Sequence, residues 1–172
     1  MAIQKSSTKT ALDLGNFESV VDEKLNSIFQ RLTKNQTTID KSISYALSNP
    51  GKRIRPTLVF LVGDFLGIET SRLESIAGAI ELIHTYSLVH DDLPCMDDDD
   101  LRRGKPTLHK KFNESTAVLA GDALQTLAFN LILDDKNLNI SEKQDLLRDL
   151  AKRIGPEGMD LAQNLDIENE QK

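Results

Sequence analysis

Apolar residues recur at steps of three and four along most of the chain, which is the spacing of amphipathic α-helices. They predict a first helix over residues 17–32, with Asn16 as its N-cap, and a second helix over about 38–47. Residues 1–15 are polar and show no such period, so we expect a disordered tail there. The helical domain is therefore expected to cover residues 16–172.

A basic turn precedes the third predicted helix. An Asn-Pro-Gly turn ends the second helix, and an apolar run over residues 58–66 follows it. Pro56 suits the first turn of a helix, because its missing N–H would be unpaired there in any case. Cations just before that turn would add to the attraction of the helix N-terminus for an anion. A solvated basic turn is the alternative interpretation. The cations are Lys52, Arg53 and Arg55.

The fourth predicted helix carries the most acidic part of the chain at its end. Ser71 and Glu74 have the spacing of a capping box, and the helical pattern behind them continues to His90. His84 and Asp91 are seven residues apart, so they lie on one face of this helix, about 10 Å apart along its axis.

Pro94 should end or kink this helix directly after Asp91 and Asp92. The chain can then turn so that Asp97 folds back towards Asp91.

Three further helical patterns complete the chain. Asn113 or Ser115 can cap an apolar helix over residues 118–131, which we expect to belong to the core. Ser141 and Gln144 form another predicted capping box, and Gly155-Pro156 closes the helix that they open. The pattern restarts after residue 157. No run of alternating apolar residues predicts a sheet, so the expected fold class is all-α.

Composition excludes several classes of protein. The net charge of −6 comes from one place: 27 acidic residues minus six aspartates between 91 and 100 leaves 21, equal to the 21 Lys plus Arg. This balance predicts no nucleic-acid partner. Cys95 is the single cysteine, which fits a reducing compartment. The N-terminus lacks an apolar signal run, and no later stretch looks long enough to span a bilayer. We therefore expect a cytoplasmic protein without membrane insertion.

The acidic cluster at residues 91–100 needs cations or solvent to offset its repulsion. Arg102, Arg103 and Lys105 follow it, and a hard divalent cation beside guanidinium groups is a usual way to bind a diphosphate. An EF-hand does not fit, since Leu108 stands where that loop needs its glutamate. The histidines and Cys95 also lack zinc-site spacing. The alternatives left are a magnesium-diphosphate site and a solvated acidic loop.

Three segments resemble motifs of one family. Residues 91–97 (DDLPCMD), with LRRGKPT at 101–107, resemble the first aspartate-rich motif of trans-polyprenyl diphosphate synthases, in the form found in bacterial farnesyl and geranyl diphosphate synthases. Residues 51–56 (GKRIRP) are similar to the basic motif of that family, and His84 lies seven residues before the first aspartate, as in the family. The resemblance covers about residues 17–168.

This resemblance implies an isoprenoid-synthase helical bundle and a prenyltransferase that condenses isopentenyl diphosphate with an allylic diphosphate, either dimethylallyl or geranyl. It implies Mg²⁺ as cofactor, a homodimer, and a geranyl or farnesyl diphosphate product. The metal ligands and catalytic residues would be Asp91, Asp92 and Asp97, with Arg102 as a further catalytic residue. The residues that bind substrate would be Lys52, Arg53, Arg55, His84, Arg102 and Arg103, and product length would depend on Tyr86 and Ser87.

Two parts of the family pattern differ in this sequence. No second aspartate-rich motif occurs within the 172 residues, so the bundle is expected to be incomplete at its C-terminal side. The Gly-Gly-Gln segment of the family reads Leu-Ala-Gln at residues 161–163, with Gln163 and Asp166 kept. Two alternatives stay open. One is an inactive fragment or a non-catalytic subunit that binds diphosphate or a full-length synthase. The other is a metal-dependent phosphohydrolase built on His90 and Asp91.

Overall fold

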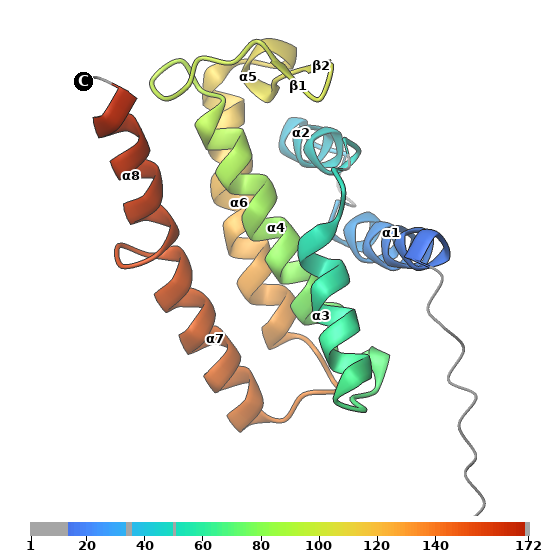
Figure 1. Cartoon of the computed structure of the whole chain (residues 1–172). Helices are drawn as coiled ribbons and strands as arrows, with labels where there is room; N and C mark the ends of the chain where they lie inside the picture. Colours follow the sequence, from blue (N-terminus) through green and yellow to red (C-terminus); the bar gives the residue numbers. More distant parts are fainter. Residues whose placement is uncertain (1–13, 34–35, 50, 171–172) are drawn as a thin grey trace, which may run out of the picture.

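The computed structural model describes residues 14–33, 36–49 and 51–170, and helices dominate it (Figure 1). This confirms the predicted all-α class. The predicted tail over residues 1–15 lies almost wholly outside the described residues. The helices are α1 (Leu14–Leu32), α2 (Thr38–Leu47), α3 (Ile54–Phe65), α4 (Glu74–Asp91), α5 (Leu108–Lys111), α6 (Glu114–Leu133), α7 (Ile140–Ile154) and α8 (Met159–Glu170), with a 3-10 turn at Thr70–Arg72.

One small feature was not predicted. Strands β1 (Leu101–Arg102) and β2 (Lys105–Pro106) pair antiparallel and form a short hairpin between α4 and α5. Strands this short give too little period-2 pattern to be recognised in a sequence.

Helix α4 is the central element of the bundle. It lies side by side with α6, and α3 covers another of its faces (Figure 1). Both helices carry fully buried small residues, Ala77 and Ala79 on α4 and Ala117 and Ala120 on α6. A Cβ added at Gly121 of α6 would lie 2.1 Å from Nε2 of His90, so the two helix backbones approach closely there. This packing fixes the C-terminal end of α4, which carries the aspartates.

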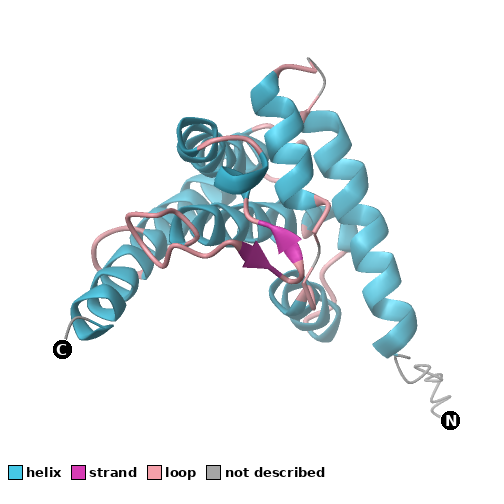
Figure 2. Cartoon of the chain, turned by 90° about the horizontal axis from the view of Figure 1, so that it is seen from above, coloured by secondary structure: helices cyan, strands magenta, loops and turns pink. Residues whose placement is uncertain are grey.

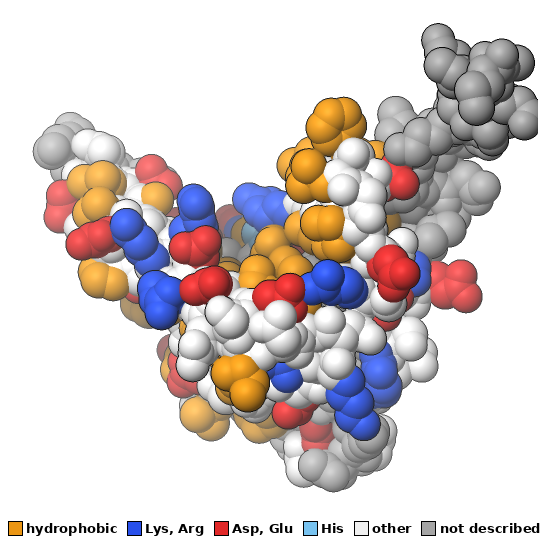
Figure 3. All heavy atoms as spheres, turned by 90° about the horizontal axis from the view of Figure 1, so that it is seen from below, with side chains coloured by type: hydrophobic (Ala, Val, Ile, Leu, Met, Phe, Trp, Pro, Cys, Tyr) orange, Lys and Arg blue, Asp and Glu red, His pale blue; other side chains and the backbone are white. Residues whose placement is uncertain are grey.

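The remaining helices leave a broad hollow open. Viewed from above, α7 and α8 extend to one side of the α4–α6 pair, and α1 lies on the opposite side (Figure 2). In space-filling view, a hollow with hydrophobic side chains on its walls separates two arms of the molecule (Figure 3). Helix α3 exposes a row of large apolar residues, namely Ile54, Leu58, Val62 and Phe65.

Two of the predicted helix ends are confirmed. Oδ1 of Asn113 accepts a hydrogen bond of 2.7 Å from the backbone N–H of Thr116, so Asn113 caps α6. Helix α7 ends at Ile154 with Gly155 as its C-cap.

Three predicted N-caps were wrong. Helix α1 already includes Asn16, because it begins at Leu14. The 3-10 turn occupies the place of the first capping box, and Glu74 pairs with Lys24 at 2.7 Å instead. The capping box of α7 is formed by Asn139 and Glu142, two residues earlier than predicted. Sequence spacing alone did not separate these neighbouring candidates, since several polar residues precede each helix.

Helix α6 corrects one further expectation. Its 20 residues are long and apolar enough to span a membrane by length and composition, so the prediction that no stretch reaches this length was wrong. Its packing along α4 gives another reason for the apolar sequence, because a helix contacted on several sides carries apolar residues all round. We therefore assign α6 as a core helix of the bundle.

Candidate functional site

The acidic segment at residues 91–100, called the aspartate turn below, begins where α4 ends. Helix α4 stops at Asp91, and the backbone N–H of Asp97 donates a hydrogen bond of 2.9 Å to the carbonyl oxygen of Asp91. The chain thus folds back after Pro94, as predicted. Burial raises the pKa of Asp91, and the neighbouring charge of Asp97 adds to this shift. A carboxylate pair whose mutual repulsion is not fully offset is a suitable place for a cation.

Asp92 faces a different partner from Asp91. Its side chain is buried, and its Oδ1 accepts a hydrogen bond of 2.6 Å from Nε of Arg102. Nη2 of Arg102 also reaches Asp99 at 3.3 Å. Burial raises the pKa of Asp92, while the Arg102 guanidinium lowers it. The predicted metal ligands therefore fall into two groups: Asp91 and Asp97 lie together, whereas Asp92 pairs with Arg102.

Helix α8 closes the aspartate turn from the opposite side. Nε2 of Gln163 donates a hydrogen bond of 2.7 Å to Oδ1 of Asp91. Asp166, one turn further along α8, lines the same cavity as Asp91 and Asp97. Gln163 and Asp166 both match the family pattern in the sequence. Only the fold shows that they lie beside the first aspartate.

The donor set fits a hard cation. Within the described residues, no three His, Cys, Asp or Glu side chains are close enough to form a complete metal cage. The cavity instead offers carboxylate oxygens from Asp91, Asp97 and Asp166. Mg²⁺ is usually bound in this way, by one or two carboxylates together with waters and substrate phosphates. These residues therefore fit Mg²⁺ better than a metal that needs nitrogen or sulfur ligands.

A second cavity collects the basic residues. It is lined by Lys52 just before α3, Arg55 in the first turn of α3, His84 from α4, and Arg103 from the hairpin. Nη1 of Arg55 lies 3.4 Å from Nε2 of His84. Burial lowers the pKa of His84, and the charges of Arg55 and Arg103 lower it further. Arg53 and Glu81 also line the cavity but pair with each other, which leaves the cations Lys52, Arg55 and Arg103 beside an imidazole whose lowered pKa favours its neutral form. This set suits an anion with several oxygens.

Arg53 makes different contacts from its neighbours in the basic turn. Its guanidinium is buried, forms an ion pair with the buried Glu81, and donates from Nε to Asp22 at 2.9 Å. Its backbone has a positive φ of 48° as the N-cap of α3. The side chain therefore ties the basic turn to α1 and α4, while Lys52 and Arg55 on either side of it are exposed.

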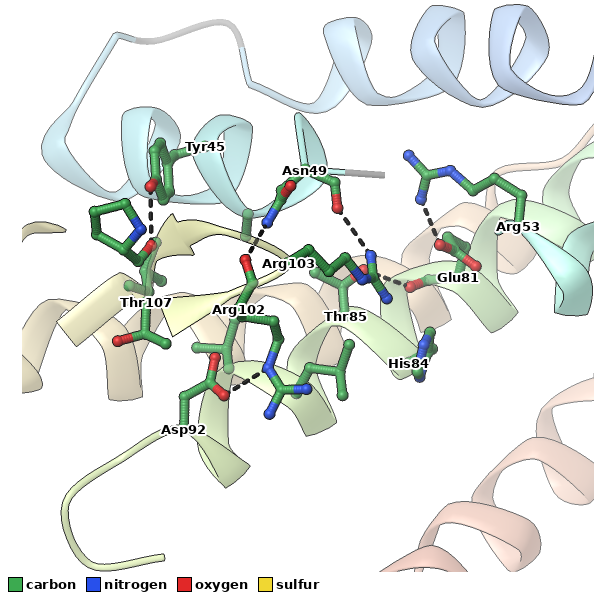
Figure 4. Close-up of a pocket in the computed structure, with 15 residues that line it drawn as sticks. Tyr45, Asn49, Arg53, Glu81, His84, Thr85, Asp92, Arg102, Arg103 and Thr107 are labelled. Carbon is green, nitrogen blue, oxygen red and sulfur yellow. Dashed lines mark hydrogen bonds and ion pairs between the residues drawn. The ribbon is translucent and has the colours of Figure 1, made fainter. Parts of the chain in front are cut away.

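The hairpin contributes one arginine to each group of charges, and both arginines line the pocket drawn in Figure 4. Arg102 points to the aspartate side, where it meets Asp92, and the next residue, Arg103, reaches the basic cavity. Asn49, which follows α2, contacts both of them: its Nδ2 donates to the Arg102 carbonyl at 2.9 Å, and its carbonyl accepts from Arg103 Nη1 at 2.9 Å. The sequence identified Asn49 only as part of the turn after the second helix, because an asparagine in a turn carries no signal of these contacts.

Gly51 makes room for this arrangement. A Cβ at Gly51 would lie 2.5 Å from Cζ of Arg103, so a side chain there would displace the guanidinium. The glycine of the basic motif therefore allows the close approach of the hairpin.

Tyr86 and Ser87 lie on the buried face of α4. The Tyr86 ring packs edge-on against His90, with ring centroids 5.7 Å apart. Burial raises the pKa of Tyr86, and the nearby charge of Asp160 adds to it. The Ser87 hydroxyl donates to the carbonyl of His84 at 2.9 Å, within its own helix.

His90 belongs to the contact between helices. Its Nε2 lies 3.1 Å from the carbonyl oxygen of Val118 and 3.9 Å from Asp122 of α6. This ring therefore packs on α6, and the structure gives no support to a phosphohydrolase centre built on His90 and Asp91.

A helical bundle with an aspartate turn and an adjoining arginine hairpin at one end of its central helix defines an isoprenoid-synthase type of protein. The chain belongs to the polyprenyl synthetase family, whose model matches residues 36–172. This confirms the resemblance seen in the three motifs.

Relatives and solved structures agree with this assignment. The chain is 44% identical over 160 residues to farnesyl diphosphate synthase of Haemophilus influenzae, covering 93% of this chain and 54% of that protein. It is 47% identical over 161 residues to the Geobacillus stearothermophilus enzyme of the same name, covering 92% and 54%. The structure of an FPP/GFPP synthase from Zymomonas mobilis matches with a TM-score of 0.89 at 36% identity, covering 94% of this chain and 60% of that one. The chain thus spans about half the length of the curated relatives that it matches.

Proposed function

We propose that the protein acts as a prenyltransferase that condenses isopentenyl diphosphate with dimethylallyl or geranyl diphosphate. One observation carries this proposal. Consecutive residues of the hairpin contact two different groups of charges: Arg102 pairs with Asp92 beside the first aspartate, and Arg103 lines the cavity of Lys52, Arg55 and His84. Two diphosphates held at these two groups would both lie close to the same short hairpin, as a reaction between two diphosphate esters requires.

Each of the two substrates has a binding position next to particular side chains. Asp91 and Asp97 would hold Mg²⁺, which supplies charge neutralisation at the diphosphate of the allylic substrate. Arg102 donates hydrogen bonds on the same side. The cations of the basic cavity hold isopentenyl diphosphate through its diphosphate, and His84, kept neutral by its lowered pKa, adds an N–H donor.

The chemistry that follows depends on positioning. The allylic C–O bond breaks and the diphosphate leaves with the electron pair, while the double bond of isopentenyl diphosphate forms the new C–C bond. Loss of one proton, taken up by the released diphosphate, restores a double bond. The side chains of this site bind, orient and stabilise charge, and none is required as a covalent nucleophile.

The proposal also covers product length, location and assembly. Tyr86 and Ser87, on the helix below the aspartates, would limit the length of the product, with farnesyl diphosphate as the expected product. We also propose a cytoplasmic homodimer. The second candidate is a non-catalytic subunit that uses the same cavities to bind diphosphate.

Calorimetry with inorganic diphosphate tests the site. We expect diphosphate to bind in the presence of Mg²⁺, and Asp91→Ala to weaken this binding by about 100-fold, since it removes a carboxylate from a metal site. Asp149→Ala, which removes an exposed aspartate on α7, is the control and should leave the affinity unchanged. Equal binding by wild type and Asp91→Ala would show that the site is wrongly assigned.

An extension assay separates the two candidates. Formation of geranyl or farnesyl diphosphate from isopentenyl and dimethylallyl diphosphates supports the enzyme. Mg²⁺-dependent diphosphate binding with no extension supports the non-catalytic subunit.

A further inference from the structure

We infer that Asn49 is a positioning residue that sets the two arginines of the hairpin for their separate diphosphates. The inference rests on the proposed function, because it concerns the same two cavities. Within the described residues, Asn49 makes no direct contact with the aspartates or with Lys52 and Arg55. It acts only through Arg102 and Arg103, which it contacts from the end of α2.

The hairpin turn has a backbone that needs support. Its two central residues, Arg103 and Gly104, both have positive φ, at 53° and 77°. This suits glycine, but the left-handed region is unfavourable for arginine, because its Cβ comes too close to the following carbonyl oxygen. The strands on either side contribute only two residues each, Leu101–Arg102 and Lys105–Pro106. A ladder this short is marginal by itself, so contacts from outside the hairpin decide whether the turn keeps its shape.

Asn49 supplies two such contacts at the turn. Its side-chain amide donates to the carbonyl of Arg102, the residue just before the turn, and its backbone carbonyl accepts from the guanidinium of Arg103. The first contact fixes the path of the backbone, and the second fixes where the guanidinium lies. Figure 4 shows Asn49 placed between Arg102 and Arg103. The left-handed conformation of Arg103 is therefore held where it directs the side chain to the basic cavity.

Tyr45, on α2 four residues before Asn49, provides a matched comparison. Its hydroxyl donates to the carbonyl of Pro106 at 2.9 Å, so it also ties α2 to the hairpin. This contact lies at the far end of β2 and touches neither arginine. If Asn49 served only to attach the hairpin to α2, loss of the Tyr45 hydrogen bond would have a similar effect on diphosphate binding.

The experiment measures inorganic diphosphate binding by calorimetry, without Mg²⁺ to report on the basic cavity and with Mg²⁺ to report on the aspartate turn. We expect Asn49→Ala to weaken both by about fivefold, the effect of one hydrogen bond. Tyr45→Phe should stay within about twofold of wild type. Equal effects of the two variants, or an unchanged affinity in Asn49→Ala, would overturn the positioning role.

A double-mutant cycle with Arg103→Ala asks whether Asn49 acts through the arginine. Without Mg²⁺, adding Asn49→Ala to Arg103→Ala should change the remaining affinity by less than about twofold, because the group to be positioned is gone. A full fivefold loss in that background would show that Asn49 acts by another route, and the inference would fail.

Limited trypsin digestion separates this inference from the proposed function. Cutting after Arg102 and Arg103 reports on the turn without any ligand, and cutting at Lys152 in α7 gives an internal reference for global unfolding. We expect Asn49→Ala to raise the ratio of hairpin to α7 cleavage several-fold. An unchanged ratio would show that Asn49 does not stabilise the hairpin turn. If the ratio rose but the protein bound no diphosphate, Asn49 would still be shown to stabilise the turn, whereas the proposed function would be refuted.

Discussion

Gln163 donates a hydrogen bond of 2.7 Å from Nε2 to Oδ1 of Asp91, across 72 positions of sequence. This contact joins α8 to the end of α4 and lowers the pKa of Asp91, against the effects of burial and of Asp97. It therefore helps to keep the first aspartate ionised and correctly oriented at the proposed metal site.

Replacing Gln163 by alanine should weaken Mg²⁺-dependent diphosphate binding about tenfold, or about 1.4 kcal/mol, because a hydrogen bond to a charged group is lost. Calorimetry with inorganic diphosphate measures the change. Asn164→Ala is the control, since Nδ2 of Asn164 donates to Glu168 on the exposed side of the same helix. Similar losses in both variants would indicate a general disturbance of α8 and contradict a specific role for Gln163.

The ion pair between Arg53 and Glu81 leads to a prediction about stability. Both side chains are buried, so Arg53→Met should lower the free energy of unfolding by about 3 kcal/mol by leaving the Glu81 carboxylate without its partner. Urea denaturation followed by circular dichroism measures this loss. The double variant Arg53→Met/Glu81→Gln should recover part of it, because the uncompensated charge is removed. If the double variant lost the sum of the two single effects, the pair would not be coupled.

The lowered pKa of His84 predicts a dependence of stability on pH. Because the pKa is lower in the folded than in the unfolded state, the unfolded state takes up a proton first as the pH falls below about 6.5. The contribution of His84 to the free energy of unfolding therefore decreases as the pH falls from about 7.5 to about 5.5.

His84→Gln removes this titration and provides the comparison. The free energy of unfolding of wild type and of His84→Gln is measured by urea denaturation at both pH values. The value for wild type should fall relative to that of His84→Gln at the lower pH. The raised pKa values of Asp91 and Asp92 act in the opposite direction, but they are common to both proteins. A difference that stays constant with pH would mean that the pKa of His84 is not lowered in the folded state.

Local order is what the sequence by itself determined. The period of its apolar residues predicted most of the helices, and Pro94 predicted the break that lets Asp97 return to Asp91. The spacing of seven residues placed His84 and Asp91 on one helix face, and the three motifs identified the family. All of these depend on residues close together in the chain, where helix geometry fixes the distances.

Only the tertiary structure decided which partner each charged group meets. Neighbouring aspartates separate, Asp91 towards Gln163 and Asp92 towards Arg102, and Arg53 pairs with Glu81 while the cations on either side of it face solvent. The role of Asn49 also emerges only when α2 and the hairpin come together. Such contacts join segments far apart in sequence, and the packing of α4 against α3 and α6 sets them, so no local pattern of residues predicts them.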